Sequence, residues 1–279
     1  MKFTWPTALL LLGSLGAFLQ PKWGVEEDAV REQGIDLLIC LDVSRSMLAR
    51  DVSPDRLGRA KAEIEALLQR LDADRVGLIL MAGEAQRAAP LTNDFQSFRA
   101  ILDLASPESV FQGGTNLASA LQKARALFDA APSTQKNVLL ISDGEDRSGS
   151  ALEQAKLCSK DGIVIYALGL GTEAGSKMTL RDEQGVEFFL TDEEGVEVVS
   201  KLDSSSLARI AEMTGGTLLS LSAQAGVLVP WYEQTLLPRA QQAFAADDRL
   251  RRANRFQLPL FFGLLGAFFG LAGFGRRQR

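Results

Sequence analysis

The chain has 279 residues, of which 46% are hydrophobic and 23% charged; this composition is typical of a folded globular protein and argues against disorder. Its formal net charge of −5 at pH 7 gives no electrostatic basis for binding nucleic acid. No histidine occurs in the sequence, which excludes Ser-His-Asp and Cys-His catalysis and histidine-bound zinc. Any metal would therefore be held by oxygen ligands, which suit Mg²⁺, Mn²⁺ and Ca²⁺.

The first part of the chain, residues 1–22, is predicted to be a membrane anchor. Its apolar run from Trp5 to Leu19 is shorter than the ~20 residues of a typical spanning helix. Lys2 supplies the charged start of a signal peptide, which is the alternative interpretation. Because no small-x-small cleavage site precedes Gln20-Pro21, we favour an anchor that is not cleaved.

Strand-like and helix-like segments alternate in the middle of the chain, residues 26–228. This alternation predicts an α/β domain with a doubly wound, mainly parallel sheet and helices on both faces. Ser53-Pro54 is expected to open the first helix, since serine suits the N-cap and proline the first helical position. Strands are expected at residues 35–41, 76–81, 137–142, 163–168 and 217–221, and further helices at 96–104, 117–130, 151–160 and 205–213.

Two turn signals, at residues 182–185 and 192–195, interrupt this alternation. They lie between β-rich runs and predict a β-hairpin insertion at about residues 176–201. After the domain, residues 229–255 are expected to form a linker helix.

The segment 256–275 carries no charged residue and has the ~20 apolar residues that a transmembrane helix needs. The α/β domain is thus expected to be flanked by N- and C-terminal transmembrane helices. Positive charge lies on both sides of the second span, so the positive-inside rule does not decide the orientation. The arginines between residues 249 and 255 are candidates for contact with anionic lipid headgroups, or they only mark the membrane boundary.

Oxygen-bearing side chains follow the first predicted strand of the domain. Asp42, Ser44 and Ser46 come directly after residues 35–41. Alternate residues that leave a strand point to a common side, so one carboxylate and two hydroxyls can converge on one point. In an open parallel sheet, ligands bind beyond the carboxyl ends of the strands.

Two further oxygen donors are expected at the same edge of the sheet. Asp143 follows the strand at 137–142, and Thr115 follows Gly113-Gly114 at the head of a predicted helix. Each motif alone has a common structural explanation, as a helix cap, a loop or a turn. Their occurrence together, each at a strand end or a helix head, predicts a divalent metal site formed by Asp42, Ser44, Ser46, Thr115 and Asp143.

These five residues resemble the complete metal-ion-dependent adhesion site of von Willebrand A domains. The likeness also covers residues 113–121 and 140–145. More narrowly, residues 34–47, 53–57 and 90–94 resemble bacterial aerotolerance-type (Bat) membrane proteins, and the likeness runs over nearly the whole chain. One departure is an additional N-terminal span that such proteins often carry and that this sequence does not show.

The resemblance implies a Rossmann-like fold and a site for Mg²⁺, or for Mn²⁺ or Ca²⁺. Ser44, Ser46 and Thr115 would contact the metal directly, and Asp42 and Asp143 mostly through water. A protein partner would fill the open coordination position with an Asp or Glu carboxylate. The resemblance further implies a bacterial inner-membrane protein with two spans and a periplasmic domain, which acts in stress tolerance or complex assembly with other Bat-type proteins and a MoxR-type AAA ATPase.

Three functions fit the sequence. The first is a non-enzymatic, metal-dependent binding module displayed at a membrane. The second is an aspartate-nucleophile phosphatase, but this chemistry requires a second acid two residues after the nucleophile, where Ser44 stands. The third is a scaffold subunit in which the metal site is vestigial. A P-loop ATPase is excluded because its glycine-rich motif is missing.

Overall fold

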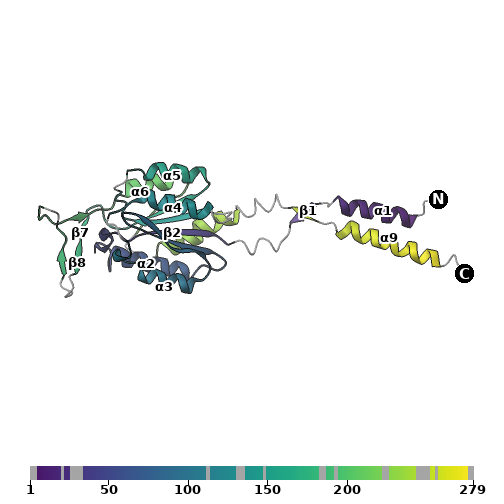
Figure 1. Cartoon of the computed structure of the whole chain (residues 1–279), viewed down its shortest axis with the longest axis horizontal. Helices are drawn as coiled ribbons and strands as arrows, with labels where there is room; N and C mark the ends of the chain where they lie inside the picture. The colour runs from purple at the N-terminus through teal and green to yellow at the C-terminus, as the bar shows by residue number, and fades with distance from the viewer. Residues whose placement is uncertain are drawn as a thin grey trace. The chain divides into compact units, whose positions relative to one another are not determined.

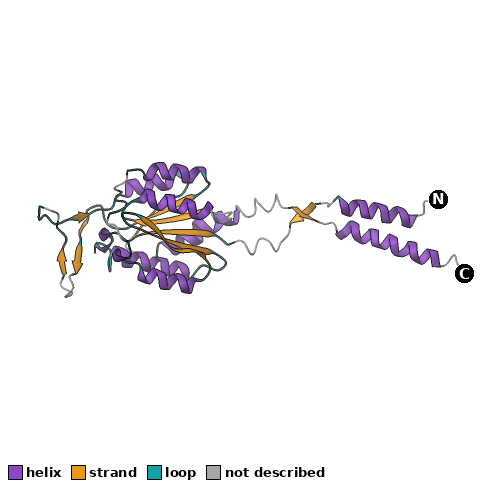
Figure 2. Ribbon diagram, in the orientation of Figure 1, coloured by secondary structure: helices purple, strands orange, loops and turns teal. Residues whose placement is uncertain are grey.

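The computed structural model describes residues 5–19, 22–25, 34–110, 114–129, 136–146, 149–181, 187–191, 194–221, 226–242, 252–254 and 257–275. The chain divides into two compact units, Gly34–Ala240 and a second unit formed by Met1–Gln33 with Gln241–Arg279. Figures 1 and 2 show the helices and strands of both units.

A six-stranded sheet forms the centre of the unit Gly34–Ala240, with the strand order β11-β6-β5-β2-β3-β4. All neighbouring strands are parallel except β3 and β4, which are antiparallel. Every residue of β2 is buried, as its apolar sequence requires at the centre of a sheet covered on both faces. The strands are β2 (Asp36–Asp42), β3 (Arg75–Met81), β4 (Ala85–Thr92), β5 (Lys136–Ser142), β6 (Val164–Gly169) and β11 (Leu218–Ser220).

Helices cover both faces of this sheet, which confirms the predicted doubly wound, mainly parallel α/β fold. In Figure 1, α4, α5 and α6 lie on one face and α2 and α3 on the other. Leu38 and Cys40 of β2 point to the α4–α6 side, where they join a continuous apolar core. The helices are α2 (Arg56–Leu68), α3 (Phe95–Leu104), α4 (Leu117–Asp129), α5 (Ala151–Lys160), α6 (Ser204–Met213) and the short α7 (Leu228–Trp231).

The prediction that a helix opens at Ser53-Pro54 is wrong. Helix α2 begins at Arg56, and its N-cap is Asp55, whose side chain accepts a 2.7 Å hydrogen bond from the backbone N–H of Gly58. An aspartate in this position satisfies one of the free N–H groups of the first turn as well as serine does. The helix therefore starts later than the sequence suggests, and Arg56 becomes its first residue.

Strand β4 (Ala85–Thr92) was not predicted from the sequence. It lies at the edge of the sheet, where Ala89 is its one fully buried residue and the alternation of apolar and polar residues is weak. Pro90 argues against a strand, but an edge strand tolerates proline because one row of its backbone groups faces away from the ladder.

Short antiparallel strands occupy the region 176–201, where a hairpin insertion was expected. Strands β7 (Ser176–Lys177) and β10 (Val199–Ser200) pair at its base, and β8 (Thr179–Arg181) and β9 (Glu187–Phe189) pair further out. An exposed ion pair of 2.8 Å between Arg50 and Glu187 connects β9 with the loop that precedes α2. We call residues 176–201 the insertion.

The unit Gly34–Ala240 continues past residue 228, where the domain was predicted to end. After α7 the chain forms a π-helical turn, η4 (Tyr232–Leu236), and both Tyr232 and Leu236 are buried. The Tyr232 hydroxyl donates a 2.6 Å hydrogen bond to Asp74, which also accepts a hydrogen bond of 2.6 Å from the backbone N–H of Ile35. Asp74 thus joins the start of the unit to the helical turn η4.

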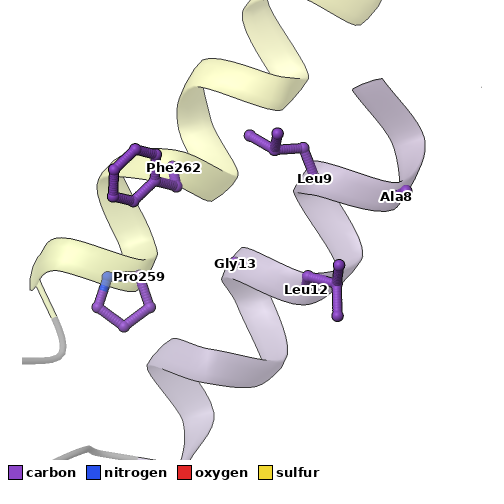
Figure 3. A pocket seen from close by; sticks show the side chains of 6 residues that line it. All are labelled: Ala8, Leu9, Leu12, Gly13, Pro259 and Phe262. Atoms are coloured by element: carbon purple, nitrogen blue, oxygen red, sulfur yellow. The ribbon is translucent and has the colours of Figure 1, made fainter. Parts of the chain in front are cut away.

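The second unit contains two apolar helices, α1 (Trp5–Phe18) and α9 (Gln257–Gly275), and the strand pair β1 (Lys22–Val25) and β12 (Arg252–Asn254). The helices cross closely at Gly13, where an added Cβ would collide with the backbone of Gly263. An apolar pocket beside this crossing is lined by residues of both helices, among them Leu9 and Phe262 (Figure 3). Within the described ranges, no helix combines the length and apolar character needed to cross a membrane, so both predicted spans remain predictions.

Candidate metal centre

The candidate site lies at the point where the direction of the sheet's connections reverses. From β2 the chain runs to β3 and β4 on one side, and it then returns to β5 on the other side of β2. At such a switch point, the loops beyond the carboxyl ends of the two central strands diverge and leave a crevice. Asp42 is the last residue of β2, and Ser142 is the last residue of β5.

Asp42 is fully buried, and hydrogen bonds hold both of its carboxylate oxygens. Oδ1 accepts a 2.8 Å hydrogen bond from the backbone N–H of Ser44, and Oδ2 accepts one of 2.7 Å from Oγ of Ser142. The orientation of this carboxylate is therefore set by its own loop and by the neighbouring strand.

Ser44 and Ser46 lie on the loop after β2, and their hydroxyl oxygens are 2.9 Å apart. The 3₁₀ turn η2 (Arg45–Leu48) directs Ser46 inward and leaves Arg45 exposed. Both serines are buried, so the two hydroxyls converge as the alternation along the loop predicts.

Asp143 follows β5 and is also fully buried. Its Oδ1 accepts a hydrogen bond of 3.2 Å from the backbone N–H of Glu145. Its Oδ2 accepts two hydrogen bonds, at 3.0 Å from Nη1 of Arg56 and at 3.1 Å from Oγ of Ser200. This carboxylate therefore sits between its own loop, the start of α2 and the base of the insertion.

Thr115 is buried on the loop that leads into α4, directly after Gly114, whose φ is +103°. The backbone N–H of the next residue, Asn116, donates a 2.9 Å hydrogen bond to the carbonyl oxygen of Ala82 at the end of β3. This bond ties the loop to the strand beside β2. Among the described residues, no hydrogen bond joins the Thr115 side chain to the other four predicted ligands, and Gly113 lies outside the described residues.

The two carboxylates are electrostatically unfavourable as a metal-free pair. Burial, and then the nearby charge of Asp143, raise the pKa of Asp42 to about 7, although the hydrogen bonds from Ser142 and Ser44 oppose the shift. Burial raises the pKa of Asp143 as well, against an opposing hydrogen bond from Ser46. A cation bound between them would relieve both effects.

The chemistry of the predicted donors fits a hard divalent cation. Two carboxylates and three hydroxyls offer oxygen ligands only, which Mg²⁺, Mn²⁺ and Ca²⁺ prefer. Among the described residues, no group of three or more Asp, Glu, Cys or His side chains is placed to hold a metal ion. A metal at this edge of the sheet would depend on the hydroxyls of Ser44, Ser46 and Thr115 as well as on the two aspartates.

Sequence reasoning missed four residues that support this site: Arg56, Ser142, Ser200 and Asp51, whose carboxylate accepts hydrogen bonds of 2.8 and 2.7 Å from the Arg56 guanidinium. Arg56 lies in the Bat-like stretch 53–57 and Ser142 in the stretch 140–145 that resembles von Willebrand A domains, but the sequence predicts no role at the site for either residue. Ser200 lies in the insertion and belongs to no motif. A fully buried arginine next to two aspartates is visible only once distant segments are brought together, so no local pattern signals it.

The comparison with protein families gives one match in this region. The model of the von Willebrand factor type A domain matches residues 37–145, a range that contains all five predicted ligands.

Two solved structures resemble the chain over most of its length. The first, the conserved hypothetical protein BatB from Bacteroides thetaiotaomicron, is 30% identical with a TM-score of 0.64, and the match covers 76% of this chain and 98% of that one. The second, an aerotolerance-related membrane protein from Bacteroides fragilis, is also 30% identical with a TM-score of 0.64, over 77% of this chain and 99% of that one.

Curated relatives share less of the sequence. A UPF0353 protein from Nocardia farcinica is 27% identical over 78% of this chain and 67% of its own length. An uncharacterized protein from Borreliella burgdorferi is 26% identical over 68% of this chain and 54% of its own length. The chain thus spans between about half and two thirds of these relatives.

Proposed function

Since the chain belongs to the von Willebrand factor type A family, among its aerotolerance-related Bat proteins, we propose that its α/β domain binds a divalent cation and uses it to grip a protein partner. The metal would be held by Asp42, Ser44, Ser46, Thr115 and Asp143.

The observation that carries this proposal is the burial of two neighbouring carboxylates beside two converging hydroxyls. Asp42 accepts hydrogen bonds only from neutral donors, Ser44 and Ser142, and no ion pair joins it to a cation among the described residues. A buried charge normally has a cationic partner or a metal. Arg56 is the cationic partner of Asp143, and a divalent cation would be the partner of Asp42.

We infer the ligand roles from the family resemblance. Ser44, Ser46 and Thr115 would bind the metal directly, and Asp42 and Asp143 mostly through water. The bound metal, Mg²⁺ in the first instance, would supply a positively charged coordination position for a carboxylate oxygen of the partner. With the two aspartates ionised the metal site is neutral overall, so it remains able to accept an Asp or Glu from another protein.

The surroundings of the site suit a protein partner. Arg45 is exposed between two of the proposed ligands, where it can attract an acidic segment. The insertion exposes Phe188, Phe189 and Val199, each with more than 40% of its surface accessible. Exposed apolar side chains often take part in interaction surfaces, and these support such a role for the insertion.

We further propose that the chain acts at a bacterial inner membrane, with two spans and the domain in the periplasm. The apolar helices α1 and α9 support an anchoring role for the second unit, as does the description of the Bacteroides fragilis relative as a membrane protein. Other Bat-type proteins and a MoxR-type AAA ATPase are the proposed partners in stress tolerance or complex assembly.

The buried position of Asp42 favours binding over phosphatase chemistry. A nucleophilic carboxylate must present a free oxygen to the substrate. Both oxygens of Asp42 are engaged, and its side chain has no solvent-accessible surface.

Calorimetric titration of Mg²⁺ and Mn²⁺ into the detergent-solubilised full chain tests the proposal, with Asp42→Ala and Asp143→Ala as variants. Circular dichroism must first show that both variants are folded. Saturable binding in the parent that both variants lose would support the site. Repeating the titration in acetate asks whether a free carboxylate strengthens metal binding, as a partner's carboxylate would. A folded parent that binds neither metal, with or without acetate, would favour the scaffold with a vestigial site.

A further inference from the structure

Arg56 is the largest fully buried side chain in the described part of the protein, and its guanidinium connects three segments. Nε and Nη2 donate to the two oxygens of Asp51, at 2.8 and 2.7 Å. Nη1 donates to Oδ2 of Asp143 at 3.0 Å, to Oγ of Ser200 at 2.7 Å and to the carbonyl oxygen of Ser46 at 3.3 Å. Arg56 thus contacts two of the five proposed metal ligands.

The planar shape of the guanidinium is what allows these contacts. It presents several N–H donors in fixed directions, so one edge can bind Asp51 bidentately while Nη1 faces the metal centre. The surrounding chain is shaped to this group. Gly171 has a φ of +120°, and an added Cβ there would lie 2.7 Å from Cζ of Arg56.

With all three nearby aspartates ionised, a divalent cation would balance the charges around Arg56. Asp42, Asp51 and Asp143 are buried or nearly so, and together they carry three negative charges when ionised. Arg56 supplies one positive charge, which leaves a deficit equal to a divalent cation. The guanidinium therefore complements the proposed metal and does not replace it.

Ser200 extends this network into the insertion. It belongs to β10, where it pairs with Ser176 of β7 at the base of the insertion. Its hydroxyl accepts from Nη1 of Arg56 and donates to Oδ2 of Asp143, and its carbonyl oxygen accepts from Nη2 at 3.2 Å. A displacement of β10 would consequently move a donor that holds a proposed ligand.

We propose that Arg56 is a positioning residue that holds Ser46 and Asp143 in place for the metal and, through Ser200, couples the insertion to the metal centre. The inference rests on the proposed metal site and adds a regulatory link to it. Because coupling between two sites is reciprocal, metal binding orders the base of the insertion, and a partner that shifts the insertion changes the affinity for metal.

Metal titration of the full chain with Mn²⁺ tests the positioning role, with Arg56→Lys and Ser200→Ala as variants. Lysine keeps the positive charge but loses the planar fork, so we expect metal binding about 10- to 100-fold weaker, as for other groups that orient metal ligands. Ser200→Ala should weaken binding in the same direction by a smaller factor.

Matched controls separate positioning from general stability. Arg59→Lys alters an arginine on the same helix that pairs with Glu63, and Ser204→Ala removes an exposed hydroxyl bonded to Glu173. Both controls should keep the parent's affinity. If Arg56→Lys stays folded, loses thermal stability and yet binds Mn²⁺ as tightly as the parent, Arg56 is merely structural and the proposal is overturned.

Hydrogen–deuterium exchange tests the coupling. Saturating Mg²⁺ should slow amide exchange at residues 176–178 and 198–201 in the parent, and this protection should be lost in Ser200→Ala at saturating metal. Protection that is absent from a metal-binding parent, or retained in the variant, would overturn the coupling. If the parent binds no metal, the proposed metal site itself is overturned. That result is distinct from one in which the parent binds metal and the variants bind it equally well.

Discussion

Oγ of Ser142 donates a 2.7 Å hydrogen bond to Oδ2 of Asp42, across the boundary between the two central strands. The same Oγ accepts a 3.0 Å hydrogen bond from the backbone N–H of Gly144, in the loop that carries Asp143. Ser142 therefore fixes the positions of both aspartates relative to each other.

Ser142→Ala should destabilise the domain and weaken metal binding. It leaves a buried carboxylate without one donor and a buried N–H without its acceptor, at a cost of about 1–3 kcal/mol. Urea unfolding of the metal-free protein measures the loss, with Ser204→Ala as the control. An unchanged midpoint would show that the strand ends are held together by other contacts.

Metal affinity should depend on pH near neutrality. The raised pKa of Asp42, about 7, means that a proton competes with the metal below this pH. We expect the dissociation constant for Mg²⁺ to increase by about tenfold per unit as pH falls below 7, and to level off above it. Titrations between pH 5.5 and 8.5, bounds chosen about 1.5 units either side of that pKa, would measure this dependence. An affinity that is constant over this range would contradict the burial of an uncompensated carboxylate.

The stability of the metal-free fold should change with pH in the opposite direction to the metal affinity, so that it falls as pH rises. The folded-state pKa of Asp42 lies above its unfolded value, so the folded state binds the proton more tightly. The resulting stability is fully present below the unfolded pKa, near 4, and is lost as pH rises through about 7. Asp42→Asn should remove this contribution in urea unfolding at pH 5.5 and 8. If the parent and the Asp42→Asn variant show the same pH dependence of stability, Asp42 is not the source of that dependence.

Tyr232→Phe should destabilise the α/β unit without changing its metal affinity. The substitution removes the 2.6 Å hydrogen bond to Asp74, a residue that also holds the backbone of Ile35. We expect a loss of about 1–2 kcal/mol, because a buried carboxylate loses one of its donors. Urea unfolding and Mn²⁺ titration of the same variant measure the two effects. A change in metal affinity at constant stability would contradict a purely structural role.

Gly13→Leu should separate α1 from α9 within the second unit. The side chain would meet the backbone of Gly263 and Pro259, which cannot move aside as a flexible side chain can. Disulfide cross-linking of a Leu9→Cys, Phe262→Cys pair would report the contact, since both residues line the same pocket (Figure 3). The cross-link should be lost with Gly13→Leu and kept with Leu11→Ala, which alters an exposed residue. Equal cross-link yields in the Gly13→Leu and Leu11→Ala variants would argue against a close crossing of the helices at Gly13.

Much of the domain could be predicted from local patterns. The central strands β2 and β5 are continuous apolar runs, and such runs are typical of parallel strands buried on both faces. The edge strand β4 could not be predicted in the same way, because half-exposed positions and a proline leave little periodic signal.

The candidate ligands were predictable because the topology of a parallel sheet places strand ends together. This logic predicts that Asp42 and Asp143 lie at the same edge of the sheet, where the structure places them. Arg56 is different: its partners Asp143 and Ser200 lie 87 and 144 residues away in the sequence. Arg56 lies in the Bat-like stretch 53–57, but contacts over such separations depend on tertiary packing, which the sequence of that stretch does not reveal.

Anomalous diffraction from crystals of the protein grown with Mn²⁺ would locate the proposed metal itself. We expect one anomalous peak at the carboxyl ends of β2 and β5, within bonding distance of Ser44, Ser46 and Thr115 oxygens and close to Asp42 and Asp143. Crystals of Asp42→Ala should lack this peak. A well-ordered domain with no peak at this edge of the sheet, or with Mn²⁺ bound only elsewhere, would show that these five residues do not form a metal site.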